Sequence, residues 1–247
     1  MRILSSGVFN APLRHGSPIL REHNSPEDLS EQTIQALNQI THDVSYPEAA
    51  LIFGEGQDSR GVYVLCEGMV KLTNANCDGK TFIMKIAQPG AILGLHDVVT
   101  GNPYTLTAEA LQPSQLGFIS GSDFLAFIKH HGDMCIYVTQ QLISDCNSAY
   151  EVIRSIGLSG TVVEKLARLF LQWSIDGQGI GGVTQLKQLL THEEIAQLIG
   201  STRETVTRVL GRLRKSKVVE LDGFTLAIWD KVAIERLAQS DNRATMR

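Results

Sequence analysis

The hydrophobic residues change their spacing along the chain, and these changes mark the elements that we expect. Between Tyr46 and Ser120 they gather in short runs rich in Val, Ile, Phe and Tyr, and most runs are bounded by glycine. Strands that turn at glycine favour a compact antiparallel β-roll, and Asp78-Gly79 indicates one of its hairpins. The expected strands are Ala50 to Phe53, Val62 to Cys66, Met69 to Thr73, Thr81 to Ile86, Tyr104 to Ala110 and Ser114 to Ile119.

Helical spacing flanks this region. Leu29 to Ile40 predicts a short helix before it, Ser122 to Lys129 another after it, and Asp133 to about Ile156 a long helix. In the long helix one set of residues recurs at alternating steps of three and four, which is typical of a coiled-coil seam with one polar member. We expect this seam to join a parallel homodimer, with packing against the chain's own roll as the alternative. The seam comprises Cys135, Val138, Leu142, Asp145, Ala149, Val152 and Ile156.

Two adjacent helices are indicated between Thr191 and Lys215. Thr191 and Glu194 fit a capping box at the start of the first helix, and Gly200 suits the left-handed turn that ends it. Ser201 or Thr202 can cap the second helix. Its apolar positions are Val206, Val209, Leu210 and Leu213. The basic residues between Ser201 and Lys217 are Arg203, Arg208, Arg212, Arg214, Lys215 and Lys217, against the single acid Glu204. Such a strip suits an anionic partner.

The remaining C-terminal elements complete a second domain. A helix from Val162 to Trp173 and a glycine-rich link from Asp176 to Gly182 precede the helix pair. After it, Val218 to Leu221 and Phe224 to Ile228 predict a two-stranded wing, and Asp230 can cap a last helix from Lys231 to Ala238. The expected fold class is therefore α+β. Its parts are a flexible arm (1–28), a β-roll sensor domain (29–131), a dimerisation helix (132–158) and a winged helix-turn-helix domain (159–247).

Composition and charge narrow the functional classes. The 247 residues carry a formal net charge of −4, yet from Gly181 onward eleven Lys or Arg face eight Asp or Glu, so the basic surplus lies in the second domain. The four cysteines show no CxxC spacing, and neither a signal peptide nor a membrane-length apolar run is evident, so we expect a cytoplasmic protein without membrane association. No P-loop, nucleophile elbow or HExxH motif suggests an enzyme or a metal site.

The order of these parts resembles the CRP/FNR family of bacterial transcription regulators. The resemblance rests on Ser-Thr-Arg-Glu-Thr-Val-Thr-Arg (201–208) and on the roll segments Ala-Leu-Ile-Phe-Gly-Glu-Gly (50–56), Gly-Val-Tyr-Val-Leu-Cys-Glu-Gly (61–68) and Pro-Gly-Ala-Ile-Leu-Gly (89–94). It covers roughly Leu29 to Leu237. It implies double-stranded DNA with a palindromic operator, a second copy of the chain and, as a further candidate, RNA polymerase as partners.

The resemblance also implies roles for the recognition helix. Arg203, Glu204 and Arg208 match the base-reading residues of CRP-like members, and Thr207 stands where the family varies between base contact and none. Arg can bind guanine in a fork, and Glu can accept a hydrogen bond from cytosine. If Ser201 is the cap, however, Glu204 is instead engaged in a capping box. The expected DNA phosphate contacts are Thr191, Ser201, Thr202, Thr205 and Arg212.

The effector is not identified by the sequence. Cyclic-nucleotide-binding members carry Gly-Glu for the ribose and Arg, then Ser, Thr or Ala, for the phosphate; here these positions are Gly94-Leu95 and Tyr104-Thr105, which argues against cyclic AMP. No cysteine precedes Cys66, which argues against an iron–sulfur cluster. His96 matches a haem ligand of a carbon-monoxide-sensing relative and is a weak haem-ligand candidate. The effector-pocket candidates are Gly94, Leu95, His96, Tyr104 and Thr105.

We therefore expect a dimeric, sequence-specific DNA-binding regulator controlled by a small signal other than cyclic AMP. One alternative is a regulator of the same fold that works without a ligand or responds to redox state or haem. Another, from a different class, is a β-roll ligand-binding protein or enzyme without DNA specificity.

Overall fold

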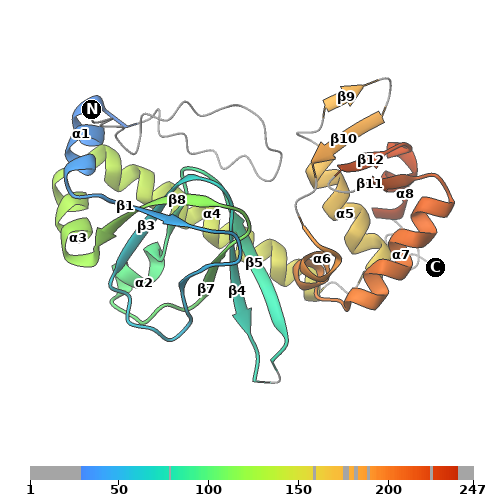
Figure 1. The fold of residues 1–247 in the computed structure, drawn as a ribbon, viewed down its shortest axis with the longest axis horizontal. Coiled ribbons are helices and arrows are strands. Elements are labelled where there is room, and N and C mark those ends of the chain that lie inside the picture. Colours follow the sequence, from blue (N-terminus) through green and yellow to red (C-terminus); the bar gives the residue numbers. More distant parts are fainter. Residues whose placement is uncertain are drawn as a thin grey trace. The chain divides into compact units, whose positions relative to one another are not determined.

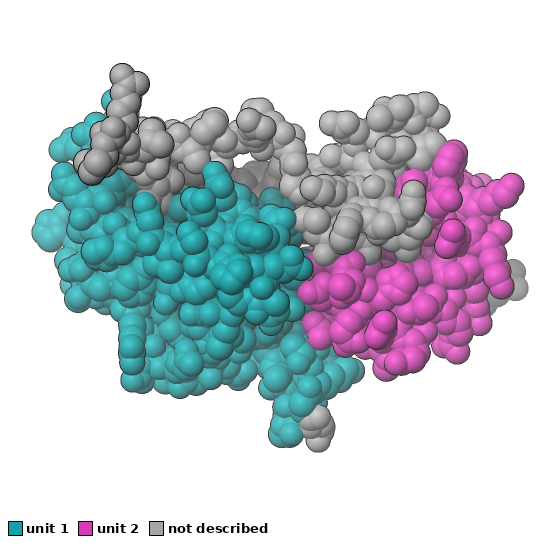
Figure 2. Space-filling model, in the orientation of Figure 1, with its two compact units in different colours: residues 1–14, 22–149 teal, residues 15–21, 150–247 magenta. Residues whose placement is uncertain are grey.

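Figure 1 shows the fold in a computed structural model. Figure 2 colours the two compact units into which the chain divides, one ending at Ala149 and the other beginning at Tyr150. The expected arm, 1–28, lies outside the described residues. The structure describes residues 29–77, 79–157, 160–174, 178–180, 183–187, 190–222 and 225–238, with side chains omitted at 151–157, 178–180, 183–187, 221–222 and 225.

Two four-stranded antiparallel sheets form the β-roll of the first unit (Figure 1). One sheet has the order β1-β8-β3-β6 and the other β2-β7-β4-β5. Each expected strand is present, although Ala50, Met69 and the first three residues of the Tyr104 run lie outside the strands, and two further strands, β1 and β6, were not predicted. The strands are β1 (His42–Tyr46), β2 (Leu51–Phe53), β3 (Gly61–Glu67), β4 (Val70–Ala75), β5 (Thr81–Ala87), β6 (Ile92–Leu93), β7 (Thr107–Ala110) and β8 (Ser114–Ser120).

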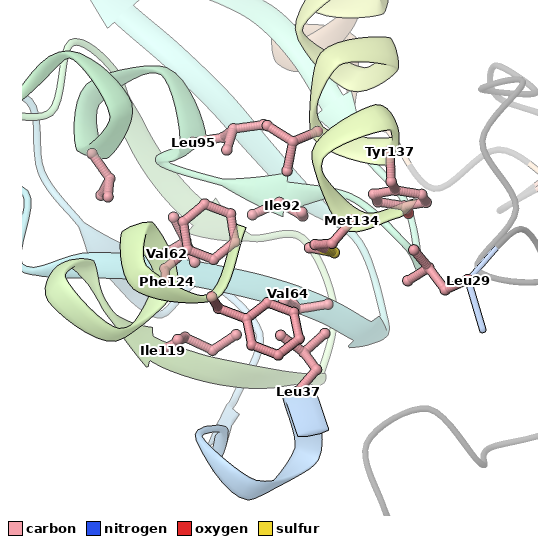
Figure 3. Close-up of a cluster of buried hydrophobic side chains, with 13 residues drawn as sticks. Leu29, Leu37, Val62, Val64, Ile92, Leu95, Ile119, Phe124, Met134 and Tyr137 are labelled. Atoms are coloured by element: carbon pink, nitrogen blue, oxygen red, sulfur yellow. The ribbon is translucent and has the colours of Figure 1, made fainter. Parts of the chain in front are cut away.

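Four helices accompany the roll: α1 (Glu31–Gln39), α2 (Leu95–Thr100), α3 (Gly121–His130) and α4 (Gly132–Gly157). Figure 3 shows how side chains from three of them meet the sheet: Leu37, Phe124 and Met134 point toward Val64 and Ile119. A second apolar cluster, which includes Phe53, Leu65, Val70 and Leu116, fills the rest of the roll. The short helix α2 was not predicted, because six residues between Gly94 and Gly101 are too few to show helical periodicity.

The side of α4 that packs on the roll is the one that we had expected to join two copies. Val138 is 5% exposed and belongs to the core with Val64 and Ile92. Asp145, expected to face a second copy, instead forms an ion pair with Lys85 of β5, Nζ to Oδ1 2.6 Å. Val138 and Asp145 therefore contact the chain's own roll, the arrangement that the alternative describes. Of the other seam members, Cys135 is exposed, Leu142 and Ala149 are half-buried, and the side chains of Val152 and Ile156 are outside the described set.

The second unit contains the six helices and strands expected for the winged domain. They are α5 (Val162–Ser174), α6 (His192–Ile199), α7 (Arg203–Lys215), the wing strands β11 (Val219–Asp222) and β12 (Thr225–Ile228), and α8 (Lys231–Ala238). The wing strands pair with β10 (Val183–Lys187) and β9 (Gln178–Ile180) in the order β11-β12-β10-β9. Part of the expected glycine-rich link, residues 178–180, is the short paired strand β9.

Candidate nucleic-acid interface and effector cavity

The helix pair α6–α7 is defined by its caps. The Thr191 hydroxyl accepts from the backbone N–H of Glu194 at 3.2 Å, and the Glu194 carboxylate accepts from the N–H of Thr191 at 2.8 Å, which closes the expected capping box. Gly200 ends α6 at φ 64°, a left-handed conformation that a residue without Cβ adopts cheaply. The tight turn that separates the two helices therefore follows from local sequence.

Thr202, not Ser201, is the N-cap of α7. Its hydroxyl accepts from the N–H of Thr205 at 3.3 Å, which makes Glu204 the second residue of the helix instead of the third. A capping box uses the third residue, so the Glu204 carboxylate is not engaged in one. Glu204 is exposed, and its position in the first turn is favoured by the helix dipole.

The two faces of α7 differ in character. Val206, Val209, Leu210 and Leu213 are at most 7% exposed and pack into the unit's core. The four expected base-reading residues Arg203, Glu204, Thr207 and Arg208 are all exposed on the first two turns. The exposed surface therefore presents a guanidinium, a carboxylate, a hydroxyl and a second guanidinium along about 8 Å of helix.

A contact that the sequence did not reveal joins α6 to this surface. His192 Nδ1 lies 3.0 Å from the Thr207 hydroxyl oxygen. The two residues are fifteen positions apart, so only the angle between the helices brings them together. The contact links the first residue of α6 to the expected base-reading surface of α7.

The expected phosphate contacts have different amounts of hydrogen-bonding capacity left. The Thr191 hydroxyl donates to Glu194 Oε2 at 2.9 Å, and the Thr202 hydroxyl donates to Thr205 Oγ1 at 3.0 Å. The Thr205 hydroxyl accepts in that bond and can still donate outward. The exposed Arg212 keeps its guanidinium available, and Ser201 is half-buried next to the turn.

The first unit contains a cavity of about 340 Å³ between the roll and α4. Four of the five effector-pocket candidates, Gly94, Leu95, His96 and Thr105, line it. The wall from the roll is mainly apolar and includes Phe53, Leu72, Met84, Leu93 and Leu106, and the α4 wall includes Leu142 and Ala149. A cavity of this size with an apolar lining and few polar groups suits a small-molecule ligand.

Tyr104, the fifth effector-pocket candidate, is not among the residues that line the cavity. It is 3% exposed, stacks on Phe53 with ring centroids 4.0 Å apart, and donates its phenol hydrogen to the backbone oxygen of Gly61 at 2.6 Å. Burial raises the pKa of this phenol, so it stays neutral. A Cβ on Gly94, which has φ 72°, would lie 2.6 Å from the Tyr104 ring, so glycine is needed beside it.

The polar groups at the cavity come from three elements. Asp97 of α2 is 4% exposed and accepts from the Thr105 hydroxyl at 2.9 Å, with His96 Nδ1 3.3 Å from the same oxygen. Lys85 pairs with Asp145, as described above. Gln141 of α4 is occupied by the backbone of Ile92, which it contacts through both amide atoms at 2.9 and 3.0 Å. Asp97 and Lys85 were not singled out from the sequence.

The open side of α4 carries apolar residues one position after the expected seam. Ile136, Ile143 and Tyr150 are 61%, 57% and 61% exposed and recur at intervals of seven residues. Exposed apolar residues at heptad spacing are typical of a helix that pairs with another. The sequence contains this heptad spacing, but the expected seam, one position earlier, has equally regular spacing.

The cysteines differ in their exposure to solvent. Cys77, Cys135 and Cys146 are exposed free thiols, whereas burial raises the pKa of Cys66 to about 12.

Among the residues that the structure describes, no three metal-binding side chains come together, and none of the described helices is long and apolar enough to span a membrane.

Two family models match the chain, the cyclic nucleotide-binding domain at residues 43–131 and the Crp-like helix-turn-helix domain at 164–237. Together they cover well over half of its length.

The chain also resembles known regulators at low identity. The CRP-like cAMP-activated global transcriptional regulator of Mycobacterium tuberculosis is 23% identical over 216 residues, which is 86% of this chain and 95% of the relative. The anaerobic regulatory protein of Bacillus subtilis is 24% identical over 78% of this chain and 82% of its own. The solved structure of the c-di-GMP responsive global regulator of Xanthomonas campestris shares the fold, with TM-score 0.71 and 18% identity over 81% of this chain and 99% of that one.

The relatives are transcription regulators and not enzymes, and both family models fall on the units that carry the cavity and the helix pair. The chain accordingly belongs to the CRP/FNR family of transcription regulators.

Proposed function

We propose that this protein is a homodimer that reads a palindromic DNA operator under the control of a small molecule other than cyclic AMP. The observation that carries the proposal is the two-sided helix α7, which buries four apolar residues and exposes Arg203, Glu204, Thr207 and Arg208 at its start. An α-helix fits the major groove, and these side chains match the donor and acceptor patterns of base edges there.

Glu204 supports base reading in particular. Since Thr202 caps α7, the Glu204 carboxylate is available to accept from a cytosine amino group while Arg203 addresses the paired guanine. Arg208, one turn further, would read another guanine. The phosphate contacts come from Ser201, Thr205 and Arg212, which retain donors, while Thr191 and Thr202 contribute through the caps that position both helices.

Dimerisation is assigned to Ile136, Ile143 and Tyr150 on the open side of α4, replacing the seam that contains Val138 and Asp145. A dimer would cover these apolar side chains and present two copies of α7 to successive half-sites of a duplex, about one helical turn apart. Val152 and Ile156 remain candidates further along the helix.

The cavity between roll and α4 is proposed as the signal site. Cyclic AMP is a poor fit because no arginine lines the cavity, and the Thr105 hydroxyl donates to the Asp97 carboxylate. A phosphate at that place would meet a carboxylate instead of a cation. Cyclic AMP at millimolar concentration should therefore leave operator affinity unchanged; a clear cyclic AMP titration in calorimetry would contradict this part.

The DNA-reading proposal is tested by selecting binding sites from random duplexes and measuring affinities by electrophoretic shift. The selected sites should be palindromic, and Arg208→Ala should weaken operator binding by ~1–3 kcal/mol while leaving random DNA nearly unaffected. Lys215→Ala is the matched control, because this exposed residue lies about 10 Å further along α7 and should affect both DNAs equally. If Arg208→Ala weakens binding to both DNAs equally, Arg208 contacts a phosphate and does not read a base.

A second candidate, a redox-controlled regulator, is favoured by one observation only: Cys146 is exposed on α4 and also lines the cavity. Reversible change of operator affinity on oxidation, abolished by Cys146→Ser, would support it.

A further inference from the structure

The cavity between the roll and α4 contains a buried carboxylate that has no lysine or arginine partner among the described residues. Asp97 is 4% exposed, and its side-chain partners are the Thr105 hydroxyl and His96. In the part of the chain that the structure describes, no lysine or arginine forms an ion pair with Asp97. A buried carboxylate that is not paired with a cation is costly, because hydrogen bonds from neutral groups replace only part of its hydration.

The other charges at the cavity cancel each other. Lys85 lines the wall and pairs with Asp145 at 2.6 Å, and no arginine contributes to the lining. Among the described residues Asp97 has no lysine or arginine partner, so its carboxylate is an acceptor at the cavity wall that no such cation occupies. An anionic ligand therefore meets repulsion at Asp97 and competition from Asp145 at Lys85, whereas a cationic ligand meets an available acceptor.

We infer that the cavity binds a small, mainly apolar molecule that carries a protonated amine, with the ammonium group held by Asp97. This inference rests on the proposed role of the cavity as the signal site and specifies the class of signal. The ammonium supplies the cation that the buried carboxylate lacks, and charge-assisted hydrogen bonds are stronger than neutral ones.

The rest of the cavity determines the body of the ligand. Phe53, Leu72, Met84 and Leu106 offer aliphatic and aromatic contact on the roll side, and Leu142 and Ala149 do so from α4. A volume of about 340 Å³ lies at the lower end of typical small-molecule sites, so we expect an arylalkyl or branched alkyl amine and not a nucleotide-sized polar molecule.

The test is calorimetric titration of the full chain at pH 7 without DNA, using three probes that share a ring and chain: 2-phenylethylammonium, 2-phenylethanol and phenylacetate. The ammonium probe should bind at least about tenfold more tightly than the other two. Asp97→Asn should abolish this preference, and the exposed Asp58→Asn, on the same unit but outside this cavity, should preserve it.

Thr105→Val provides a second variant in case Asp97→Asn does not fold. It removes the hydroxyl that donates to Asp97 and leaves the carboxylate in place, so ammonium binding should be kept or strengthened. Failure of the ammonium probe to bind, equal binding of ammonium and carboxylate probes, or an undiminished preference in Asp97→Asn would each overturn the inference. Operator affinity is measured separately: loss of palindrome recognition would contradict the proposed function, while ammonium selectivity would still stand.

Discussion

Ile143→Ala is the sharpest test of which side of α4 joins two copies. Ile143 is 57% exposed in the single chain, and full burial of an aliphatic side chain is worth about 1.5–3 kcal/mol. Covering the exposed half in a dimer therefore contributes about 1 kcal/mol from each protomer, or about 2 kcal/mol per dimer. Truncation to alanine should raise the dimer dissociation constant roughly 30-fold.

The assay is sedimentation equilibrium over a range of protein concentrations, combined with urea unfolding of each variant. Val138→Ala is the matched control, because Val138 is 5% exposed and packs in the core of the roll. This variant should lower the free energy of unfolding by about 2 kcal/mol through lost contacts and a small cavity, with little change in the dimer constant. If Val138→Ala weakens the dimer and Ile143→Ala does not, the assignment of the two sides of α4 is refuted.

Three further results are expected. Asp133 accepts hydrogen bonds from the backbone N–H of Ser30, the Thr33 hydroxyl and the N–H of Met134, and these bonds hold the pKa of its carboxyl well below the usual range. The stability that they give is present above pH ~4 and is lost as pH falls further. Asp133→Asn should therefore lower the free energy of unfolding at pH 7 and make that free energy decline less steeply in acid. Ellman titration should find the raised-pKa Cys66 slow to react and exposed Cys77 and Cys135 fast, and equal rates for all three would contradict the burial of Cys66. Thr191→Ala should cost about 1 kcal/mol in stability of the winged unit, measured as a lower urea midpoint, and an unchanged midpoint would show that the capping box contributes little.

The local signals in the sequence were sufficient for much of the winged unit. Thr191, Glu194 and Gly200 bracket α6 through contacts within a few residues of themselves, so their spacing alone predicts the observed caps. The cap of α7 was ambiguous because Ser201 and Thr202 are adjacent and chemically equivalent. Only the backbone shows that the helix begins after Thr202 and that Glu204 is free of the capping box.

Contacts between distant residues account for what the sequence did not predict. Two neighbouring stripes of α4 have the same spacing, and Lys85, sixty residues earlier in β5, helps to determine which of them faces the roll. Tyr104 occupies a position where the family places a cation, yet its ring is drawn into the core by Phe53 and Gly61. The sequence held one signal for Asp97, because this charged residue lies between the apolar residues Leu95 and Val98.

Helix α4 forms a single layer, with the cavity on one side and an exposed surface on the other. Leu142 and Ala149 face the cavity on one side, and Ile143 and Tyr150, each the next residue along the chain, face outward on the other. Under the proposed function, a ligand in the cavity and a second copy on the outer side would contact opposite faces of the same two turns of helix. A shift of these two turns caused by a ligand would then move the surface assigned to the second copy.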